Sequence, residues 1–311
     1  MGGSKNTMKT ISIIIPTYNE AENVPPLYAA LREQLEALEG RYGYEIIFID
    51  NKSKDDTRGE ILQLCGQDKC VKAIFNSRNF GHVNSPYYGA MQATGDCVII
   101  MGADFQDPPA LIPCMIEAWE QGHRVVCMVK SNTRSGPLTN AMRSIYYRAL
   151  RRLSDMEITE DFAGLGLYDK SVVEAVRTLD DPVPYWSGIV AELGYDMVKL
   201  PYVQAKRRAG KSSNGFSRRY DYAMAGVTAY TKAAPRLATL LGILACAASF
   251  IAAAVCLFAH REVLMTLGLF FLGGAQLFFM GLLGEYVLNI QRRGMQRPLV
   301  HEERRVNFEG D

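Results

Sequence analysis

The N-terminal part of the chain alternates between short apolar runs and longer segments whose apolar positions recur with helical spacing. The apolar runs predict strands at Ile11–Pro16, Glu45–Asp50, Val71–Asn76, Cys97–Met101 and Arg124–Val129. The longer segments predict helices at Ala21–Glu39, Asp56–Cys65, Ser85–Thr94 and Pro109–Gln121, with another near Thr139–Leu153. Because the apolar runs are continuous and alternate with helices, we expect an α/β domain whose mostly parallel sheet is covered on both faces.

Polar clusters follow four of the predicted strands directly. They are Thr17–Glu20, Asp50–Asp56, Ser77–His82 and Asp104–Asp107. Ligands of open parallel sheets bind beyond the carboxyl ends of the strands, so we expect a binding site at that edge.

Two long uncharged runs stand near the C-terminus. Leu237–Ala259 has 23 residues without a charge and Val263–Leu283 has 21, and three residues separate them. A helix rises about 1.5 Å per residue, so each run reaches roughly 30 Å, the thickness of a bilayer core. We therefore expect a two-helix transmembrane hairpin, with two buried helices of a soluble domain as the alternative.

Basic residues flank the two runs on their outer sides, whereas Arg261 is the lone arginine between them. Cytoplasmic flanks of membrane helices carry the excess of Lys and Arg. We therefore expect a multi-pass protein of the inner (plasma) membrane, with the N-terminal domain and both termini in the cytoplasm. The flanking residues are Lys232 and Arg236 before the first run, and Arg292, Arg293 and Arg297 after the second.

The charge balance and the cysteine pattern exclude several classes of protein. There are 34 Lys and Arg against 33 Asp and Glu, a net charge of +1, so we expect no nucleic-acid partner. The 7 cysteines form no CxxC pair, which excludes a disulfide scaffold and a zinc finger. The sequence has neither GxxxxGK[ST] nor a GxGxxG after the first strand, so a nucleotide would be held in another way.

Asp50 ends the second predicted strand, where its carboxylate could accept hydrogen bonds from a base or a ribose. The alternative is a turn or an N-cap for the next helix. Ser53, Asp55 and Asp56 suit that structural role better, so Asp50 is the candidate ligand-binding residue.

Asp104 and Gln106 follow a buried apolar strand and lie two residues apart in extended chain, so their oxygens can point the same way. Such oxygen donors suit a hard divalent cation that also contacts substrate phosphates. Asp107, which precedes Pro108 and Pro109, is expected to cap the next helix.

These segments together resemble a known family, the family 2 glycosyltransferases. Four motifs occur in its order: Ser12–Glu20, Ile49–Ser53, Ser77–His82 and Ala103–Pro109. With the C-terminal pair of apolar runs, they are most similar to the polyprenyl-phosphate sugar transferases, the group of dolichyl-phosphate mannose synthase and bactoprenol glucosyltransferase. The resemblance extends from about residue 10 to residue 295.

The resemblance implies a GT-A fold, the Rossmann-like fold of transferases that use nucleotide-diphospho-sugars. Pro16, Tyr18 and Glu20 match the residues that surround the base and its ribose, and Asp50 matches the carboxylate that contacts the base. These four residues are therefore the expected donor-binding residues, together with Asp104.

The resemblance also implies a cofactor and a phosphate-binding loop. Asp104 and Gln106 match the ligands of a Mg²⁺ or Mn²⁺ ion that bridges the donor diphosphate. Arg207, Lys211 and Ser212 match a loop that closes over phosphates of donor or acceptor. The alternative for the basic residues of this loop is attraction to anionic lipid headgroups, and both readings can hold at once.

The sequence departs from the family pattern at two positions. Gly102 stands where the family has the first Asp of a DxD, and Gly164 stands near the usual second-half aspartate. Asp161 is the nearest remaining carboxylate and, with Asp104, is the expected catalytic residue. A phosphate acceptor is already ionised at neutral pH, so it needs little help from a general base.

The expected organisation has four parts. A cytosolic GT-A catalytic domain spans residues 8–205, and a basic phosphate-binding loop with an interfacial helix spans 206–232. A transmembrane hairpin covers 233–290, with spans of about 237–259 and 263–286, and a cytosolic tail follows at 291–311.

The expected activity is inverting transfer of one sugar from a nucleotide-diphospho-sugar, with UDP favoured over GDP, to a polyprenyl phosphate such as undecaprenyl phosphate. The alternative is a catalytically degenerate, membrane-anchored protein that binds nucleotide-sugar or lipid phosphate. A homo-oligomer is also expected, because small residues of the second run favour packing between membrane helices.

Overall fold

The structure, a computed structural model, describes residues 8–131, 162–179, 186–205, 262–295 and 297–308, with isolated residues and short runs between them at 181, 184, 207, 208, 224, 240, 242–245, 247, 248 and 251. Its strands are β1 (Lys9–Thr17), β2 (Tyr42–Asp50), β3 (Val71–Asn76), β4 (Cys97–Ile100), β5 (Val125–Lys130), β6 (Phe162–Asp169), β7 (Met197–Tyr202) and β8 (Glu302–Val306). Its helices are α1 (Val24–Glu36), α2 (Thr57–Gln67), α3 (Gly81–Gln92), the short 3₁₀ turn η1 (Pro109–Leu111), α4 (Ile112–Glu120), α6 (Lys170–Leu179), α7 (Trp186–Glu192) and α10 (Glu262–Gly294).

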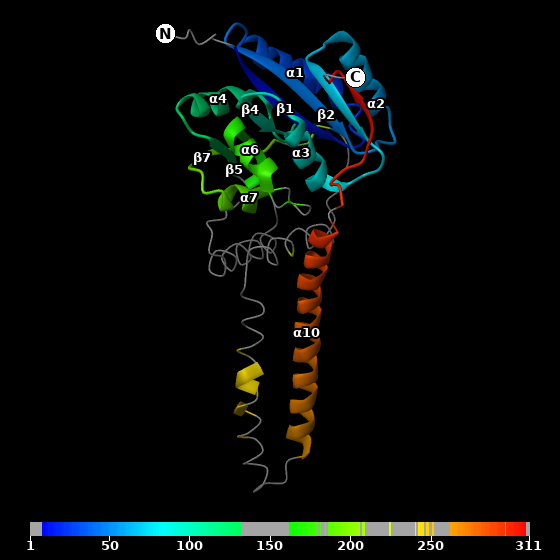
Figure 1. Cartoon of the computed structure of the whole chain (residues 1–311), viewed down its shortest axis with the longest axis vertical. Helices are drawn as coiled ribbons and strands as arrows, with labels where there is room; N and C mark the ends of the chain where they lie inside the picture. Colours follow the sequence, from blue (N-terminus) through cyan, green and yellow to red (C-terminus); the bar gives the residue numbers. More distant parts are fainter. Residues whose placement is uncertain are drawn as a thin grey trace.

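The strands form one sheet in the order β7-β5-β6-β4-β1-β2-β3-β8 (Figure 1). β1 pairs in parallel with β2 and with β4, and β2 pairs in parallel with β3. β6 is antiparallel to β4 and β5, and β8 is antiparallel to β3. The sheet is therefore mostly parallel, as predicted.

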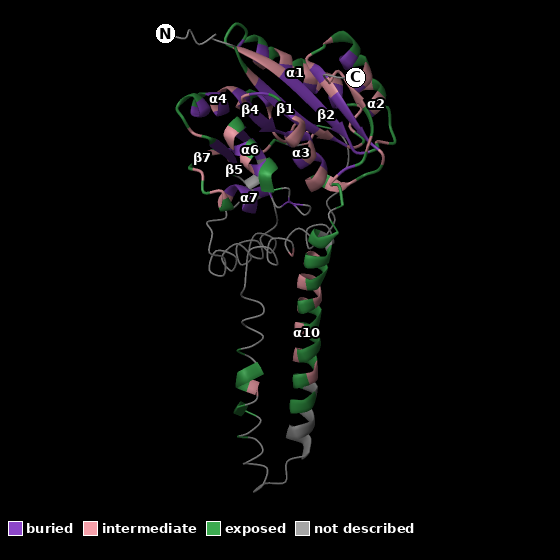
Figure 2. Ribbon diagram, in the orientation of Figure 1, coloured by how far each residue is buried: buried purple, intermediate pink, exposed green. Residues whose placement is uncertain are grey.

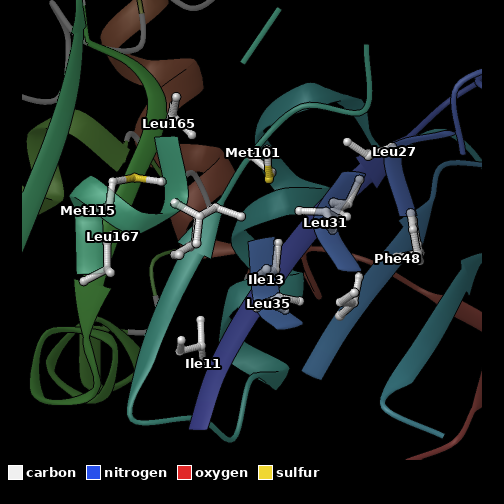
Figure 3. Close-up of a cluster of buried hydrophobic side chains, with 14 of the residues drawn as sticks. Ile11, Ile13, Leu27, Leu31, Leu35, Phe48, Met101, Met115, Leu165 and Leu167 are labelled. Atoms are coloured by element: carbon white, nitrogen blue, oxygen red, sulfur yellow. The ribbon is translucent and has the colours of Figure 1, made fainter. Parts of the chain in front are cut away.

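The sheet is covered on both faces by helices that bury alternate strand residues. On one face α1, α2 and α4 pack over a cluster that includes Ile13 and Phe48 (Figure 3). On the other face α3, α6 and α7 pack over a cluster that includes Ile14 and Ile47. Adjacent strand residues point to opposite faces, so an unbroken apolar run is what a sheet buried on both sides requires.

The five strands and four helices predicted for the N-terminal part are confirmed, although α3 begins at Gly81, four residues before Ser85. The apolar pattern does not predict β6, β7 or β8. β8 has the sequence EERRV, whose charges give no strand signal, and it lies in the segment expected to be a tail. The helix expected near Thr139–Leu153 falls outside the described residues.

α10 is a long helix that extends away from the sheet domain, with its C-terminal end next to the domain (Figures 1 and 2). Its segment Phe271–Gln291 is long and apolar enough to cross a membrane, with a mean hydropathy of 1.4 and no buried residue. Near its C-terminal end, Arg293 Nη2 lies 3.1 Å from Asp181 Oδ2. The second predicted run therefore corresponds to one candidate membrane-spanning helix.

The first predicted run, Leu237–Ala259, lies largely outside the described residues. Those described within it, 240, 242–245, 247, 248 and 251, are helical. The two-helix hairpin and the multi-pass topology therefore stay predictions.

A buried carboxylate joins three strands at the end of the sheet opposite the polar clusters. Glu45 on β2 accepts hydrogen bonds from Ser12 Oγ on β1 (2.5 Å), Lys72 Nζ on β3 (2.5 Å) and Thr94 N (2.7 Å). Burial alone would raise the pKa of the Glu45 carboxyl, but the bonds from Lys72, Ser12 and Thr94 outweigh it and lower the pKa. Glu45 is thus held ionised in the interior.

We expect Lys72→Met to destabilise the protein, because Glu45 would stay buried without its cation. Losing one partner of a buried ion pair costs about 3 kcal/mol at neutral pH. A carboxyl with a lowered pKa in the folded state stabilises the protein above its unfolded pKa, and this contribution disappears as the pH falls through the folded value. The difference from wild type should therefore shrink below about pH 4.

Denaturant unfolding of the detergent-purified chain, followed by fluorescence of the buried Trp119 and Trp186, measures this effect. Lys170→Met, which removes an exposed lysine, is the matched control. Equal losses in both variants would contradict the prediction.

Candidate active site at the carboxyl edge of the sheet

The loops that follow β1 and β2 bind each other directly. Asn19 N donates to Ser53 Oγ (2.9 Å), and Lys54 N donates back to Asn19 Oδ1 (2.7 Å). Glu20 N donates to Thr57 Oγ1 (2.8 Å) at the start of α2. The two loops therefore form one surface at the carboxyl edge of the sheet.

Three residues in the loops that follow β1, β2 and β4 have left-handed backbone conformations that non-glycine residues rarely adopt. Asn19 has φ 57°, Lys52 has φ 61° and Phe105 has φ 61°, and they follow β1, β2 and β4 respectively. Such strain costs on the order of 1 kcal/mol or more per residue and concentrates at functional sites. Among the described residues a fourth, Asn307, follows β8 at the opposite edge, so three of the four lie at this edge, which supports it as the candidate site.

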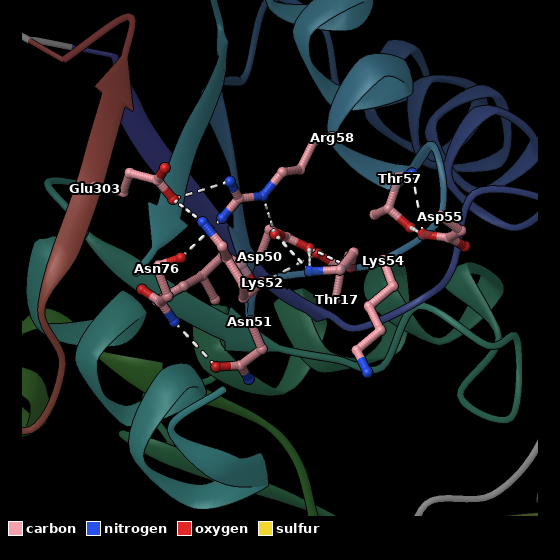
Figure 4. A network of polar contacts seen from close by, with 12 residues as sticks. Thr17, Asp50, Asn51, Lys52, Lys54, Asp55, Thr57, Arg58, Asn76 and Glu303 are labelled. Carbon is pink, nitrogen blue, oxygen red and sulfur yellow. Dashed lines mark hydrogen bonds and ion pairs between the residues drawn. The ribbon is translucent and has the colours of Figure 1, made fainter. Parts of the chain in front are cut away.

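Asp50, at the end of β2, is completely buried and accepts hydrogen bonds from within the protein (Figure 4). Arg58 Nε lies 2.7 Å from Asp50 Oδ2, Ser53 N donates to the same oxygen at 3.1 Å, and Ser53 Oγ donates to Oδ1. In this structure Asp50 therefore fixes the loop between β2 and α2.

Arg58 is the centre of this network, and sequence reasoning missed it. Besides Asp50, its guanidinium donates to Asn76 O at the end of β3 (2.7 Å) and to Glu303 Oε2 on β8 (3.0 Å). Arg58 thereby joins three strand ends. One signal in the sequence could have found Arg58. It is a basic residue in the first turn of the helix that follows Asp50, and a buried carboxylate needs a cation.

A second charged group brings together three of the predicted site residues. Asp104 is 8% exposed, and its Oδ2 lies 2.7 Å from Arg207 Nη2. Glu20 Oε1 lies 3.6 Å from Arg207 Nη1. These residues come from the loop after β1, the loop after β4 and the segment after β7, so only the fold makes them neighbours.

The environment of Glu20 disfavours its charge. Burial raises the pKa of the Glu20 carboxyl, and nearby Asp104 raises it further, while the hydrogen bond from Asn23 and the charge of Arg207 oppose them. The charge of Arg207 therefore offsets the repulsion between the neighbouring carboxylates of Glu20 and Asp104.

Gly102, where the family pattern has an aspartate, lies next to the carboxylates of two aspartates. A Cβ at this position would lie 3.4 Å from Asp104 Oδ1 and 3.6 Å from Asp107 Oδ2. The prediction that Asp107 caps the next helix is wrong: Pro108 precedes η1, and the carboxylate accepts a hydrogen bond from Tyr202 Oη (2.7 Å). The carboxylates of Asp104 and Asp107 thus both lie close to position 102.

The other predicted residues are placed as follows. Pro16 lies near the end of β1, paired with Ile49 of β2. Tyr18 is half-buried in the loop after β1. Gln106 Oε1 lies 3.5 Å from Gln204 Nε2, and its backbone carbonyl accepts from Ala205 N. Asp161, Lys211 and Ser212 lie outside the described residues.

Comparison with known proteins identifies the family. Residues 12–177 match the model of glycosyl transferase family 2. The chain belongs to this family. The match contains the loops after β1, β2 and β4, and therefore Glu20, Asp50 and Asp104.

Several relatives match almost the whole family 2 chain. The bactoprenol glucosyl transferase of Shigella phage SfX is 31% identical, covering 93% of this chain and 97% of its own. A prophage bactoprenol glucosyl transferase homolog of Escherichia coli is 30% identical, covering 93% and 96%. The solved structure of a mannosyltransferase from Pyrobaculum calidifontis, in complex with GDP-Man and Mn²⁺, has a TM-score of 0.51 at 15% identity and covers 91% and 88%. The expected GT-A fold is confirmed.

We expect Tyr202→Phe to destabilise this glycosyltransferase more at neutral than at acidic pH. Burial raises the pKa of the Asp107 carboxyl, and the Tyr202 hydroxyl partly offsets this. Without the hydroxyl the folded pKa rises further, so the loss grows as the pH rises through the folded pKa of Asp107, which lies above the unfolded value of about 3.9. A loss of about 1–2 kcal/mol at pH 7 fits a hydrogen bond to a charged group.

Urea unfolding of wild type and Tyr202→Phe between pH 4 and pH 7 measures this difference. The control repeats the comparison in an Asp107→Asn background, where the pH dependence of the loss should vanish. A loss that is the same at all pH values in the wild-type background would refute the assignment.

Proposed function

We propose that this protein transfers a single sugar, with inversion, from a nucleotide-diphospho-sugar to a polyprenyl phosphate such as undecaprenyl phosphate at the cytoplasmic face of the membrane. UDP is the proposed nucleotide, in preference to GDP. The observation that carries the proposal is the meeting of Glu20, Asp104 and Arg207 at the carboxyl edge of a family 2 domain. Carboxylates beside a guanidinium are the groups that a cation and a diphosphate require.

The proposed acceptor rests on the relatives and on α10. Proteins named bactoprenol glucosyl transferase match this chain over 93% of its length. A helix that can span a membrane suits a lipid acceptor, because it holds the enzyme where the lipid phosphate lies. We further propose that α10 is the second span of a two-span hairpin in the inner membrane, with both termini on the cytoplasmic side.

A homo-oligomer is part of the proposal. Small residues let membrane helices approach each other closely. Within the part of the chain that the structure describes, a Cβ added at Gly268, Gly273 or Gly274 of α10 would meet no atom within 4 Å, which supports close approach of another helix there.

The proposed base and ribose site lies along the loops after β1 and β2. Pro16, Tyr18 and Glu20 would line it, with Asp50 beneath. Because Asp50 is buried and already bonded to Ser53 and Arg58, its supported contribution is to hold the loop that receives the donor. A direct bond from a base to Asp50 would require one of these partners to move.

The residues present fit a Mg²⁺ or Mn²⁺ ion that is shared with a diphosphate. Asp104 and Gln106 offer carboxylate and amide oxygens, the donors that these ions prefer. Among the described residues no three His, Cys, Asp or Glu gather as a complete metal site, so phosphate and water oxygens would complete the shell. Such an ion would neutralise the charge that develops on the leaving nucleotide diphosphate.

The chain's own residues bind and orient the reacting phosphates. Arg207 would contact a donor or acceptor phosphate, and a cation at Asp104 would compete with its present bond to that carboxylate. Lys211 and Ser212 are proposed to complete this phosphate site. The acceptor phosphate oxygen attacks the anomeric carbon as the bond to the diphosphate breaks, which inverts the configuration.

The proton balance of this step is simple. A phosphate acceptor carries its negative charge at neutral pH, so no strong base is needed. Asp161 is the proposed catalytic carboxylate for any remaining proton, and Asp104 is the proposed catalytic residue at the diphosphate.

We expect Asp104→Ala to abolish most of the transfer, because it removes the main carboxylate at the diphosphate. The detergent-purified chain is incubated with undecaprenyl phosphate, Mn²⁺ and a panel of UDP- and GDP-sugars, and the glycosyl-phosphoryl lipid is measured by mass spectrometry. A loss of about a hundredfold or more fits the removal of a group that stabilises transition-state charge.

Asp196→Asn is the matched control, because Asp196 is exposed before β7, away from the site. Its rate should equal that of wild type. Nucleotide-sugar binding without any lipid product would favour the alternative, a degenerate protein that binds these ligands without turnover.

A further inference from the structure

The segment after α10 returns to the sheet and extends it. β8 pairs antiparallel with β3, so the N-terminal end of β8 lies at the carboxyl edge of the parallel strands. His301 O accepts from Ser77 N (2.9 Å), which fixes the start of β8 beside the loop after β3. This edge is the one that carries the candidate site.

Side-chain contacts hold the returning segment at both ends. Asn307 Nδ2 donates to Cys65 O and to Val71 O, each at 2.8 Å. Arg305 Nη2 donates to Gln92 Oε1 at 2.8 Å. Val300 is buried. Residues 297–308 are therefore an integral part of the domain.

A register shift in β8 redirects Glu303. Phe75 is paired with Arg304 and Asn76 with Glu302, so Glu303 is the extra residue of a bulge. Bulges re-aim side chains and occur beside active sites. Glu303 Oε2 lies 2.7 Å from Lys52 Nζ and 3.0 Å from Arg58 Nη1 (Figure 4).

Both partners of Glu303 belong to the loop region on which the proposed donor site depends. Lys52 has the strained left-handed backbone, and Arg58 neutralises the buried Asp50. These bonds also lower the pKa of the Glu303 carboxyl, so it is ionised at neutral pH. The carboxylate thus gives Lys52 an anion partner and adds a third partner to Arg58, besides Asp50 and Asn76 O.

We propose that β8 contributes to the donor site, in which Glu303 is a positioning residue that holds residues 51–58, the loop after β2 and the start of α2, in their nucleotide-binding form. The identity of the ligand rests on the proposed function. Nucleotide binding then depends on a segment that lies after the membrane helix in sequence. The competing explanation is that β8 merely covers the edge of β3, as edge protection requires. That role needs the backbone of β8 and not the carboxylate of Glu303.

Glu303→Gln separates the two explanations, because it keeps the strand and removes the charge. In the full-length chain we expect faster amide hydrogen exchange over residues 51–57, where Ser53 N and Lys54 N are now bonded. We also expect UDP affinity to weaken and the donor KM to rise by about fivefold, the size expected for two partly exposed ion pairs. The kcat and the acceptor KM should stay unchanged.

Two further variants sharpen the test. Glu303→Asp keeps the charge and should restore part of the affinity. Lys52→Gln should add little to Glu303→Gln, because the Lys52 side chain acts through its bond to Glu303. Glu33→Gln, which removes an exposed carboxylate on α1, is the matched control and should behave as wild type.

The outcomes distinguish this inference from the proposed function. Wild-type exchange, affinity and donor KM in Glu303→Gln would overturn the inference and leave the proposed function intact. If the wild-type chain binds neither UDP nor GDP, the proposed function fails, and the exchange experiment alone decides whether Glu303 positions the loop.

Discussion

Parallel pairing of β1 with both β2 and β4 is the constraint on which the rest of the structure depends. Parallel neighbours end at the same edge, and each connection must return over a face of the sheet as a helix. The polar residues after β1, β2 and β4 are therefore forced together, although long stretches of chain separate them. Glu20, Asp50 and Asp104 reach one edge for this reason. The fold of this family 2 glycosyltransferase creates its site by concentrating strand ends.

Gathering carboxylates at one edge has an electrostatic cost, and two arginines offset it. Asp50 is buried and is neutralised by Arg58, while Asp104 and Glu20 share Arg207. A buried carboxylate without a cation would be strongly destabilised. The carboxylates and their two arginines therefore have to be considered together, because removing either arginine would leave a carboxylate at this edge without its cation.

These two arginines connect the site to the parts of the chain that come before and after α10 in sequence. Arg207 lies in the chain before it, and Arg58 contacts Glu303 in the chain after α10. Because the segment after α10 is hydrogen-bonded along β3, α10 and the loop after β2 are joined through one strand. The segment after α10 is thus joined to the sheet at this edge.

The sequence by itself determined the fold class, the five N-terminal strands and the polar residues at their ends, because apolar periodicity and strand–helix alternation are local signals. The motifs at Asp50, Asp104 and Gln106 were readable from their resemblance to family 2. Only the tertiary structure decided the partners of these residues. β8 carries charges that give no strand signal, Arg58 and Glu303 are 245 residues apart, and Asp107 turns to Tyr202 instead of capping a helix. Contacts between residues far apart in sequence depend on the order in which the strands pair, and no local sequence pattern predicts that order.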